Sequence, residues 1–545
     1  MSEVESKKSV EDVVIDDANV DCSLDDVDTK HDKFTTRRVE LWAFYVYYIG
    51  NNGLSGFNFG PSQFQNLLYL AGYDPSYPPF TVACGAGDCV LPYLGRVRDV
   101  NAIVLLTNGI SFALQAVVLL LIGAWADYGY WRPNITIFFT ILAVAVSFAW
   151  LGVEDPSRWQ AGVALYILGL ITYQCALTFW TAAFPGLARD LPEVKKSAAD
   201  VTDGKKTLDD HENFESLSRN RISNVSFTVS SVGEILILAV MVGIIKGLDA
   251  GASTENNTKA FSVLIAFSGG VWLLCALPWF FLEKRRPGLA LPPQTSLLTV
   301  GFKQTYIAFR ECMKLKQTFL YLIFYFLMGD VLNTTVTVIG TLQNSVVSYS
   351  TLQLTLLLIV GIVTQALGIY LFWIVQKRFR ISTKAMLCFN VAWIIILTIW
   401  GMIGIHTDKF GFKHVWEIWL YQAYYGLMVC PWYAYSQTMI SEVSPMPQMY
   451  MIIASTSSFA NGIFDRFLFF ALFSVIGKTS AFIGPFVSSA IITASGNNDN
   501  YPFVFLFSLG MFSIIFLYFV DVKKSHVECE DFIAAEVQRK AFASS

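Results

Sequence analysis

Residues 47–60 read YYIGNNGLSGFNFG and interrupt the first long apolar segment of the chain. A plain membrane helix would carry Leu, Ile and Val here, whereas this stretch is rich in glycine and asparagine. Paired asparagines are expensive in hydrocarbon unless they face other helices or a water-filled cavity. A glycine-interrupted apolar segment is a strong sequence indicator of a binding site in transporters. We therefore predict that Asn51, Asn52 and Ser55 contact a substrate.

The composition indicates an all-α integral membrane protein. The 545 residues are 54% hydrophobic and 15% charged, against roughly 25% charged in a typical soluble domain. The net charge of -4 and the lack of a basic stripe give no support to nucleic-acid binding. The first residues lack the apolar core of a signal peptide. We expect the first membrane segment itself to direct insertion into the lipid bilayer.

The apolar blocks predict about twelve transmembrane helices, because each is long enough for a hydrocarbon core of about 30 Å. The predicted spans are 39–60, 100–126, 134–154, 160–184, 222–246, 259–282, 317–342, 351–375, 383–404, 415–440, 467–494 and 501–520.

The polar stretches between these blocks predict the domain organisation. We expect a disordered acidic tail at 1–36 and a six-helix half at 37–282, which includes a flexible charged loop at 185–221. A linker at 283–316, a second six-helix half at 317–520 and a tail at 521–545 follow. Basic residues concentrate in alternate connections, which places both termini in the cytosol. Polar interruptions at 50–53 and 329–335 suggest that the two halves are repeats.

Two acidic residues, Glu234 and Asp330, lie near the middle of predicted membrane helices. Glu234 lies near the middle of 222–246, where a buried carboxyl suits either a proton-coupling switch or a neutral, hydrogen-bonded tie between helices. Asp330 and Asn333 share one helix face. We favour a pathway role for them, in substrate binding and, for Asp330, proton coupling, because intramembrane acids are usually functional.

Lys478 lies within the predicted span 467–494 and requires a partner or a route to the membrane surface. It could pair with one of the acids or bind a substrate carboxylate. If the span begins elsewhere, Lys478 lies near an interface instead.

Residues 123–129 read GAWADYG and precede Arg132. The stretch resembles the loop motif of the major facilitator superfamily, G-x-L-A-D-x-x-G-R-[KR], although Trp125 departs from it and Gly129 comes one position early. The resemblance implies a gating role for Gly123, Asp127 and Arg132, in which the aspartate locks one access state through the neighbouring helix bundle. The alternative is a solvated loop acid.

Other residue types limit the remaining chemistry. Cys84 and Cys89 lie close together in a predicted non-cytosolic loop and are a candidate disulfide. Asn256 is the reasonable glycosylation site. All five histidines fall outside the predicted spans, so we expect no histidine metal cluster, and no phosphate-binding loop or hydrolase motif is present. The sequence predicts neither an enzyme nor a cofactor.

The sequence as a whole resembles the fungal autophagy-related protein twenty-two family. The resemblance rests on the run from Glu40 to Gly72 and on GAWADYG, GDVLNTT and GKTSAFIGP. It implies a major-facilitator-type permease of the vacuole membrane that exports leucine and other neutral amino acids after autophagic degradation. Residues 446–466 depart from the expected short basic connection, because basic residues are nearly absent before Arg466.

The leading hypothesis is an amino-acid exporter that works by alternating access, with protons as one candidate coupling ion. The alternatives are a non-transporting membrane factor in the vacuolar breakdown of autophagic vesicles and a permease for another small solute.

Overall fold

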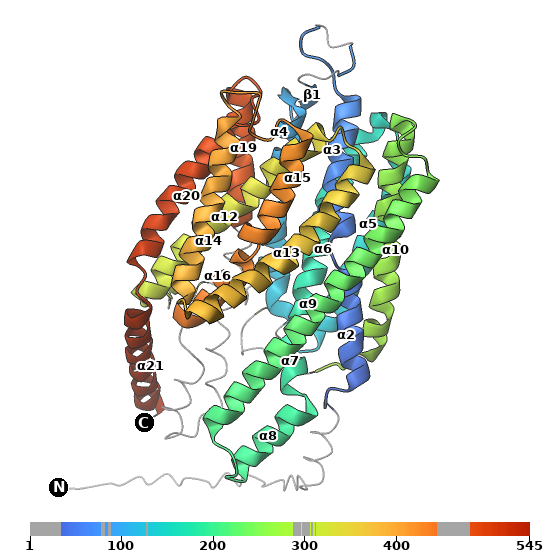
Figure 1. The fold of residues 1–545 in the computed structure, drawn as a ribbon. Coiled ribbons are helices and arrows are strands. Elements are labelled where there is room, and N and C mark those ends of the chain that lie inside the picture. Colours follow the sequence, from blue (N-terminus) through green and yellow to red (C-terminus); the bar gives the residue numbers. More distant parts are fainter. Residues whose placement is uncertain are drawn as a thin grey trace, which may run out of the picture.

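The computed structural model describes residues 34–77, 82–84, 89–126, 129–286, 312–443 and 480–544, with five single residues between 296 and 310. Asp127 and Lys478 lie outside the described residues. Long helices dominate the architecture, and the only strands in the described part are two short paired ones (Figure 1).

The helices before residue 287 form what we call the N-terminal set. Its elements are α2 (Arg38–Gly50), η1 (Leu54–Phe59), α3 (Gly60–Ala71), β1 (Val90–Tyr93), β2 (Arg96–Asp99), α4 (Val100–Ile122), η2 (Gly123–Ala126), α5 (Trp131–Ala149), η3 (Trp150–Gly152), η4 (Pro156–Arg158), α6 (Trp159–Thr181), α7 (Phe184–Arg189), α8 (Pro192–Thr202), α9 (Leu208–Gly247) and α10 (Thr254–Leu282).

The helices after residue 311 form the C-terminal set. Its elements are α12 (Lys316–Val346), α13 (Thr351–Phe379), α14 (Thr383–Ile403), α15 (Val415–Tyr424), η5 (Tyr425–Val429), α16 (Trp432–Val443), η7 (Ser480–Phe482), α19 (Ile483–Ala494), α20 (Pro502–Phe519) and α21 (Val522–Ser544).

Nine helical segments in the described residues are long and apolar enough to cross a membrane. They run roughly along one direction, so the bundle has two ends (Figure 1). The disulfide end carries β1, β2 and the first turns of α4, α10 and α13, and the tail end carries α7, α8 and α21.

The first membrane segment is longer than predicted and is broken. The expected span of 39–60 is wrong at its C-terminal boundary, because α3 continues the segment to Ala71. Pro61 occupies the first turn of α3. Backbone N–H groups in that turn have no acceptor within the helix, so the N–H that proline lacks is not needed there. Ser62, Gln63, Gln65 and Asn66 are all buried. Their polar side chains lower the apparent hydropathy of a segment that is nevertheless inside the protein.

Residues 185–221 are mainly helical, which corrects the expectation of a flexible loop. They contain α7, α8 and the first turns of α9, and α8 packs against α9 (Figure 1). The Thr207 hydroxyl caps α9 by accepting from the N–H of Asp210 at 3.2 Å. Charged residues suit a solvated helix as well as a disordered chain, so composition alone did not separate the two.

The expected C-terminal tail is also helical. α21 packs against the tail-end turns of α12 and α16. The Ser525 hydroxyl donates to the carbonyl of Val443 at 2.9 Å, and Glu528 accepts from the N–H of Gln317 at 3.0 Å. These bonds join residues 522–544 to the tail end of the C-terminal set.

Candidate functional site

The first segment breaks at Asn51–Gly53. The last α-helical bond of α2 runs from the N–H of Asn51 to the carbonyl of Tyr47 at 3.0 Å. Gly53 then adopts φ = 90°, a left-handed conformation that favours glycine. The Asn52 side chain accepts from the N–H of Leu54 at 3.0 Å and starts the π-helix η1. The predicted interruption is therefore a defined turn, and Asn52 helps to build it.

Asn51 is buried within this break, at 0% exposed. Neither its side-chain nitrogen nor its side-chain oxygen has a hydrogen-bond partner among the described residues. The Tyr47 hydroxyl lies close by, but it is bonded to the Thr140 hydroxyl at 2.7 Å. An unpaired buried amide costs about 1–3 kcal/mol, a cost that a polar ligand bonded to Asn51 would remove.

Aromatic side chains and one acid lie beside the break. The Tyr173 hydroxyl of α6 lies 3.0 Å from where a side chain on Gly53 would begin. Glu234 on α9 is half-buried and lies within electrostatic range of Tyr48 and Tyr173. One turn earlier on α9, the Ser230 hydroxyl donates to the carbonyl of Tyr48 at 3.0 Å. The N-terminal set thus gathers an amide, two phenols and a carboxyl around one helix break. Ser55 is buried in η1, directly after the break.

The second half of the predicted site has a different form. Gly329–Thr335 lies inside the unbroken helix α12, so the expected counterpart of the first break is wrong. Asp330 accepts from the N–H of Gly484 at 3.0 Å and from the Thr334 hydroxyl at 3.3 Å. These bonds join α12 to the start of α19. Asn333 is half-buried on the same helix, and no side-chain hydrogen bond among the described residues joins it to Asn51.

Arg132 of the expected gate pairs within the N-terminal set. Its guanidinium donates to Glu283 at 2.8 Å and to the carbonyl of Ala182 at 3.1 Å. Gly123 begins the short helix η2, and Asp127 lies outside the described residues. The described contacts of Arg132 therefore secure the end of α10, where the linker between the two sets begins.

A second guanidinium, at the start of the linker, also forms buried ion pairs. Arg286 donates to Glu40 at 2.7 Å and to Asp190 at 2.6 Å, and its side chain is only 8% exposed. Burial raises the pKa of the nearby Glu283 carboxyl to about 7, while Arg132 and Arg286 oppose that shift. Together Glu40, Arg132, Asp190, Glu283 and Arg286 form what we call the tail-end ion cluster.

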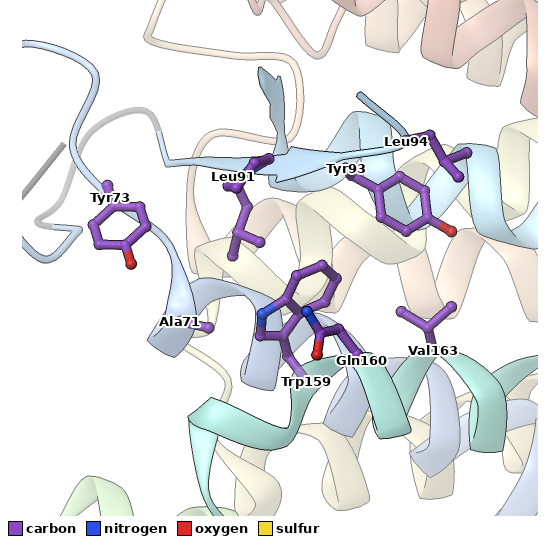
Figure 2. A pocket seen from close by; sticks show the side chains of 9 residues that line it. Ala71, Tyr73, Leu91, Tyr93, Leu94, Trp159, Gln160 and Val163 are labelled. Atoms are coloured by element: carbon purple, nitrogen blue, oxygen red, sulfur yellow. The ribbon is translucent and has the colours of Figure 1, made fainter. Parts of the chain in front are cut away.

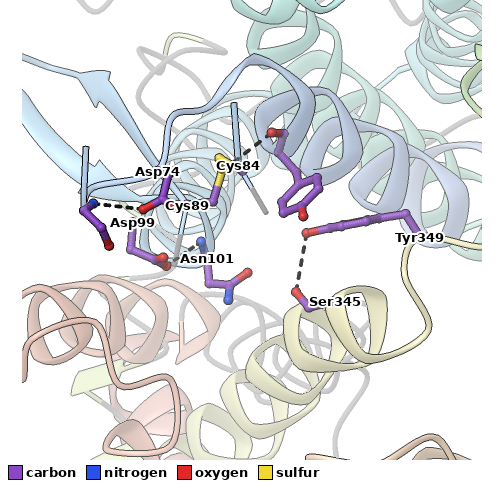
Figure 3. Close-up of a disulfide and its surroundings, with 9 residues drawn as sticks. Asp74, Cys84, Cys89, Asp99, Asn101, Ser345 and Tyr349 are labelled. Carbon is purple, nitrogen blue, oxygen red and sulfur yellow. Dashed lines mark hydrogen bonds between the residues drawn. A yellow bond between two sulfur atoms is a disulfide. The ribbon is translucent and has the colours of Figure 1, made fainter. Parts of the chain in front are cut away.

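The disulfide end holds the two modification candidates. Cys84 and Cys89 form a disulfide with a Cα–Cα distance of 5.4 Å (Figure 3). It lies against Gly72, at the end of α3. Asn256 lies in the first turn of α10, where its side chain donates to the carbonyl of Asp249 at 3.3 Å. Glycosylation of Asn256 stays a prediction from its sequence pattern.

Buried amides join the two helix sets at this end, and sequence reasoning missed them. The Asn344 amide donates to Gln65 at 2.8 Å, and Asn344 accepts from the Ser62 hydroxyl at 3.1 Å. Gln65 in turn donates to the carbonyl of Thr341 at 3.0 Å and to Asn101 at 2.7 Å. The available signal was the polar side of α3, which directly follows the glycine-rich stretch.

Two further contacts flank this central pair. Asn257 at the start of α10 accepts from the N–H of Thr351 at 3.1 Å and from its hydroxyl at 3.0 Å. Asn101 at the start of α4 donates to Asp499 at 2.6 Å. Figure 3 shows the Asn101 side chain of the N-terminal set and, in the C-terminal set, the hydrogen bond between the Ser345 and Tyr349 hydroxyls.

An open cavity of about 470 Å³ lies between the β1–β2 hairpin and the start of α6. Figure 2 shows Leu91 and Tyr93 on one side of it and Trp159 and Gln160 on the other. None of the predicted substrate contacts lines it. In the described residues, no group of three or more His, Cys, Asp or Glu side chains could hold a metal ion.

Comparison with known proteins identifies the family. The model of the family described as "Vacuole effluxer Atg22 like" matches residues 36–530. Autophagy-related protein 22 of Yarrowia lipolytica is 22% identical over 486 residues, which are 81% of this chain and 79% of that protein. The protein of the same name from Eremothecium gossypii is 23% identical over 466 residues, 83% and 84% of the two chains. The match to the Saccharomyces cerevisiae protein is 24% identical over 303 residues and spans about half of each chain, 51% of this one and 54% of that one.

Solved structures show the fold. The xylose transporter XylE from Escherichia coli, in a partially occluded inward-open conformation, superimposes with a TM-score of 0.51 at 12% identity. The alignment covers 89% of this chain and 96% of that one. The architecture is that of an all-α membrane protein resembling the major facilitator transporters. With its family model matched over most of its length, the chain belongs to the Atg22-like vacuole effluxers, a family of transporters and not of enzymes.

Proposed function

We propose that this protein exports amino acids, leucine and other neutral ones among them, from the vacuole lumen to the cytosol after autophagic degradation. Twelve transmembrane helices in two halves, 37–282 and 317–520, work by alternating access. Both termini and the tail end face the cytosol, and the disulfide end faces the lumen. Family membership and the transporter fold support this proposal.

The observation that carries the proposal is the unpaired amide of Asn51. A donor and an acceptor on one side chain match the carboxylate and ammonium groups that every free amino acid presents. Because the amide is uncharged, no charged group of the protein has to lose its water when a zwitterionic substrate binds. A helix break in the first segment is also where transporters hold substrate. We assign Asn51 the principal substrate contact, with Asn52 and Ser55 beside it.

Glu234 is the proposed coupling residue. Its carboxyl lies beside Tyr48 and Tyr173, and carboxylate and aromatic faces both attract an ammonium group. Glu234 can therefore hold either a proton or the amino group of the substrate. We prefer it to Asp330 as the proton carrier, because Asp330 already accepts two hydrogen bonds within the C-terminal set. Asn333 and Lys478 remain the proposed contacts from the second half, and Asp127 the proposed gating acid.

The substrate site is tested by separating transport from stability. Purified protein is reconstituted into vesicles, and efflux of a panel of radiolabelled amino acids including leucine is measured. We expect Asn51→Leu to lose transport and keep or gain thermal stability, because it removes an unpaired buried amide.

Asn66→Leu is the matched control. Asn66 is also buried, but it donates to the Thr258 hydroxyl at 3.0 Å, so its replacement should lower stability. Full efflux by Asn51→Leu, or no efflux of any amino acid by the wild type, would overturn the proposal.

Coupling is tested with a pH gradient across the same vesicles. Glu234→Gln should abolish the response of leucine efflux to the gradient while the protein stays folded. An unchanged response in that variant would remove Glu234 from the coupling step and leave the substrate site intact.

A further inference from the structure

At the disulfide end, three side-chain contacts join the two helix sets: one in the centre and one on each flank. In the centre, Asn344 near the end of α12 bonds to Gln65 on α3. On one flank, Asn257 at the start of α10 bonds to Thr351, the first residue of α13. On the other flank, Asp499, just before α20, bonds to Asn101 at the start of α4. We call these three pairs the disulfide-end lock.

The two flanks are equivalent if the helix sets are repeats. α10 and α20 are then the last spanning helices of their halves, and α4 and α13 are the second ones. Each flank joins the start of a last helix to the start of a second helix in the other half. The packing follows the same rule, because α4 packs on α19 and α13 packs on α9. A contact that recurs under the repeat symmetry indicates a closed arrangement of two whole halves.

The lock is made of groups that must be paired. Gln65 is 0% exposed, and Thr351, Asn344 and Asn101 are also buried. When the halves separate here, each of these groups exchanges its partner for water. The net strength of a neutral hydrogen bond is small compared with its strength in an apolar medium. Such a lock can therefore open and close repeatedly. An apolar interface of the same size would cost more free energy to expose to water.

The lock is also connected to the proposed substrate site. Asn51, η1 and Gln65 lie on one continuous stretch of chain in which α3 follows η1 without a loop. A change in the shape of the break at Gly53 therefore displaces α3, and with it Gln65.

We propose that the disulfide-end lock is the lumenal gate of the transporter, and that Gln65 is the residue that connects it to the helix break. The assignment of this end to the lumen, and of a transport cycle to the chain, rests on the proposed function. The gate itself is a conformational property that can be measured without any substrate.

The chain offers a matched control on the same helix. Gln63 and Gln65 are both fully buried on α3. Gln65 bonds to the C-terminal set, whereas Gln63 donates to the carbonyl of Thr258 at 3.2 Å and to Ser262 at 3.1 Å, inside its own set. Gln65→Leu and Gln63→Leu make the same chemical change, and only the first removes contacts between the sets.

The experiment measures the distance between the sets at the disulfide end. Cysteines are introduced at the exposed residues Ser157 and Lys409, after the native residues Cys22, Cys275 and Cys388 are replaced by serine. The labelled full-length protein is examined in lipid nanodiscs by double electron–electron resonance. We expect Gln65→Leu to raise the ratio of long-distance to short-distance populations by about two- to tenfold for each neutral hydrogen bond lost.

Gln63→Leu should leave the distance distribution as in the wild type, even if it lowers thermal stability. Asn257→Leu, which opens a flank, provides a second variant in case Gln65→Leu does not fold. The proposal is overturned if both gate variants match the wild type, or if Gln63→Leu shifts the distances as far. If the distances shift but no amino acid is transported, the gate proposal is supported and the proposed function is contradicted.

Discussion

Asp330 accepts a hydrogen bond from the backbone N–H of Gly484, 154 positions later in the chain, at 3.0 Å. The same carboxyl oxygen accepts from Thr334, so one buried acid joins α12 to the first turn of α19. A buried carboxyl that accepts two bonds is a structural tie as well as a titratable group. Its neighbour Gly484 leaves no room for a larger residue, because an added Cβ would lie 2.9 Å from the Asp330 oxygen and even closer to the Thr334 hydroxyl.

Gly484→Ala should therefore destabilise the protein by about 1–3 kcal/mol, the usual effect of overpacking a well-filled interior. Gly340→Ala on α12 is the control, because a Cβ at Gly340 meets nothing within 4 Å. Thermal unfolding in detergent checks both variants. Equal midpoints for the two would show that α19 can move away from Asp330 without loss.

Arg286 should contribute far more to stability than Arg285. Removing the Arg286 guanidinium leaves the buried Glu40 carboxylate without its ion-pair partner and leaves Asp190 with only the exposed Arg189 at 3.8 Å. Breaking a buried pair in this way costs about 3–5 kcal/mol. Arg285 is exposed and bonds only to Asn134 among the described residues, at 3.2 Å. Arg285→Ala should change stability by about 1 kcal/mol or less. Chemical unfolding of the two alanine variants measures the difference, and similar losses would contradict the cluster geometry.

Glu283 should make stability depend on pH near neutrality. Its pKa is raised to about 7 by burial, against about 4.3 in an unfolded chain. The folded state then binds more protons than the unfolded state between these values. The contribution of Glu283 is fully present below about pH 4 and is lost as the pH rises through about 7.

Glu283→Gln should flatten this dependence. The melting temperature of the wild type should fall more steeply from pH 5 to pH 8 than that of the variant. Differential scanning fluorimetry over that range makes the comparison. Parallel curves would mean that the bond to Arg132 keeps Glu283 ionised throughout.

Hydropathy alone predicted most of the long helices, because their side chains are apolar along almost the whole length of each helix. The predicted span 383–404 lies within one residue of α14. The predicted end of the first segment was wrong for a physical reason. Gln63 and Gln65 are buried and form hydrogen bonds with other helices, whereas a hydropathy scale treats every glutamine as a residue exposed to water. Charge patterning likewise did not predict the helices of 185–221.

In the candidate site, the sequence predicted only the features that depend on contacts between residues close together in the chain. Gly53 and Asn52 form the break through contacts within a few residues, and the sequence indicated it. The partners of Asp330 and of Gln65 lie 154 and 279 positions away. Residue type indicates that a buried amide or acid needs a partner, but the partner itself is chosen by the packing of whole helices. For this reason the pairing between Asn344 and Gln65 was not predicted.

Gly53→Ala tests whether the helix break is needed for transport. Gly53 has φ = 90°, and a residue with a Cβ held in the left-handed region costs about 1–2 kcal/mol. The added methyl would also meet the Tyr173 hydroxyl at 3.0 Å. The variant should unfold at a lower temperature and lose most amino-acid flux, because relief of the strain reshapes the turn that holds Asn51. Gly243→Ala on α9 is the control, since a Cβ there has no neighbour within 4 Å and alanine favours the helix. Flux at wild-type level in folded Gly53→Ala would show that the substrate path does not depend on this turn.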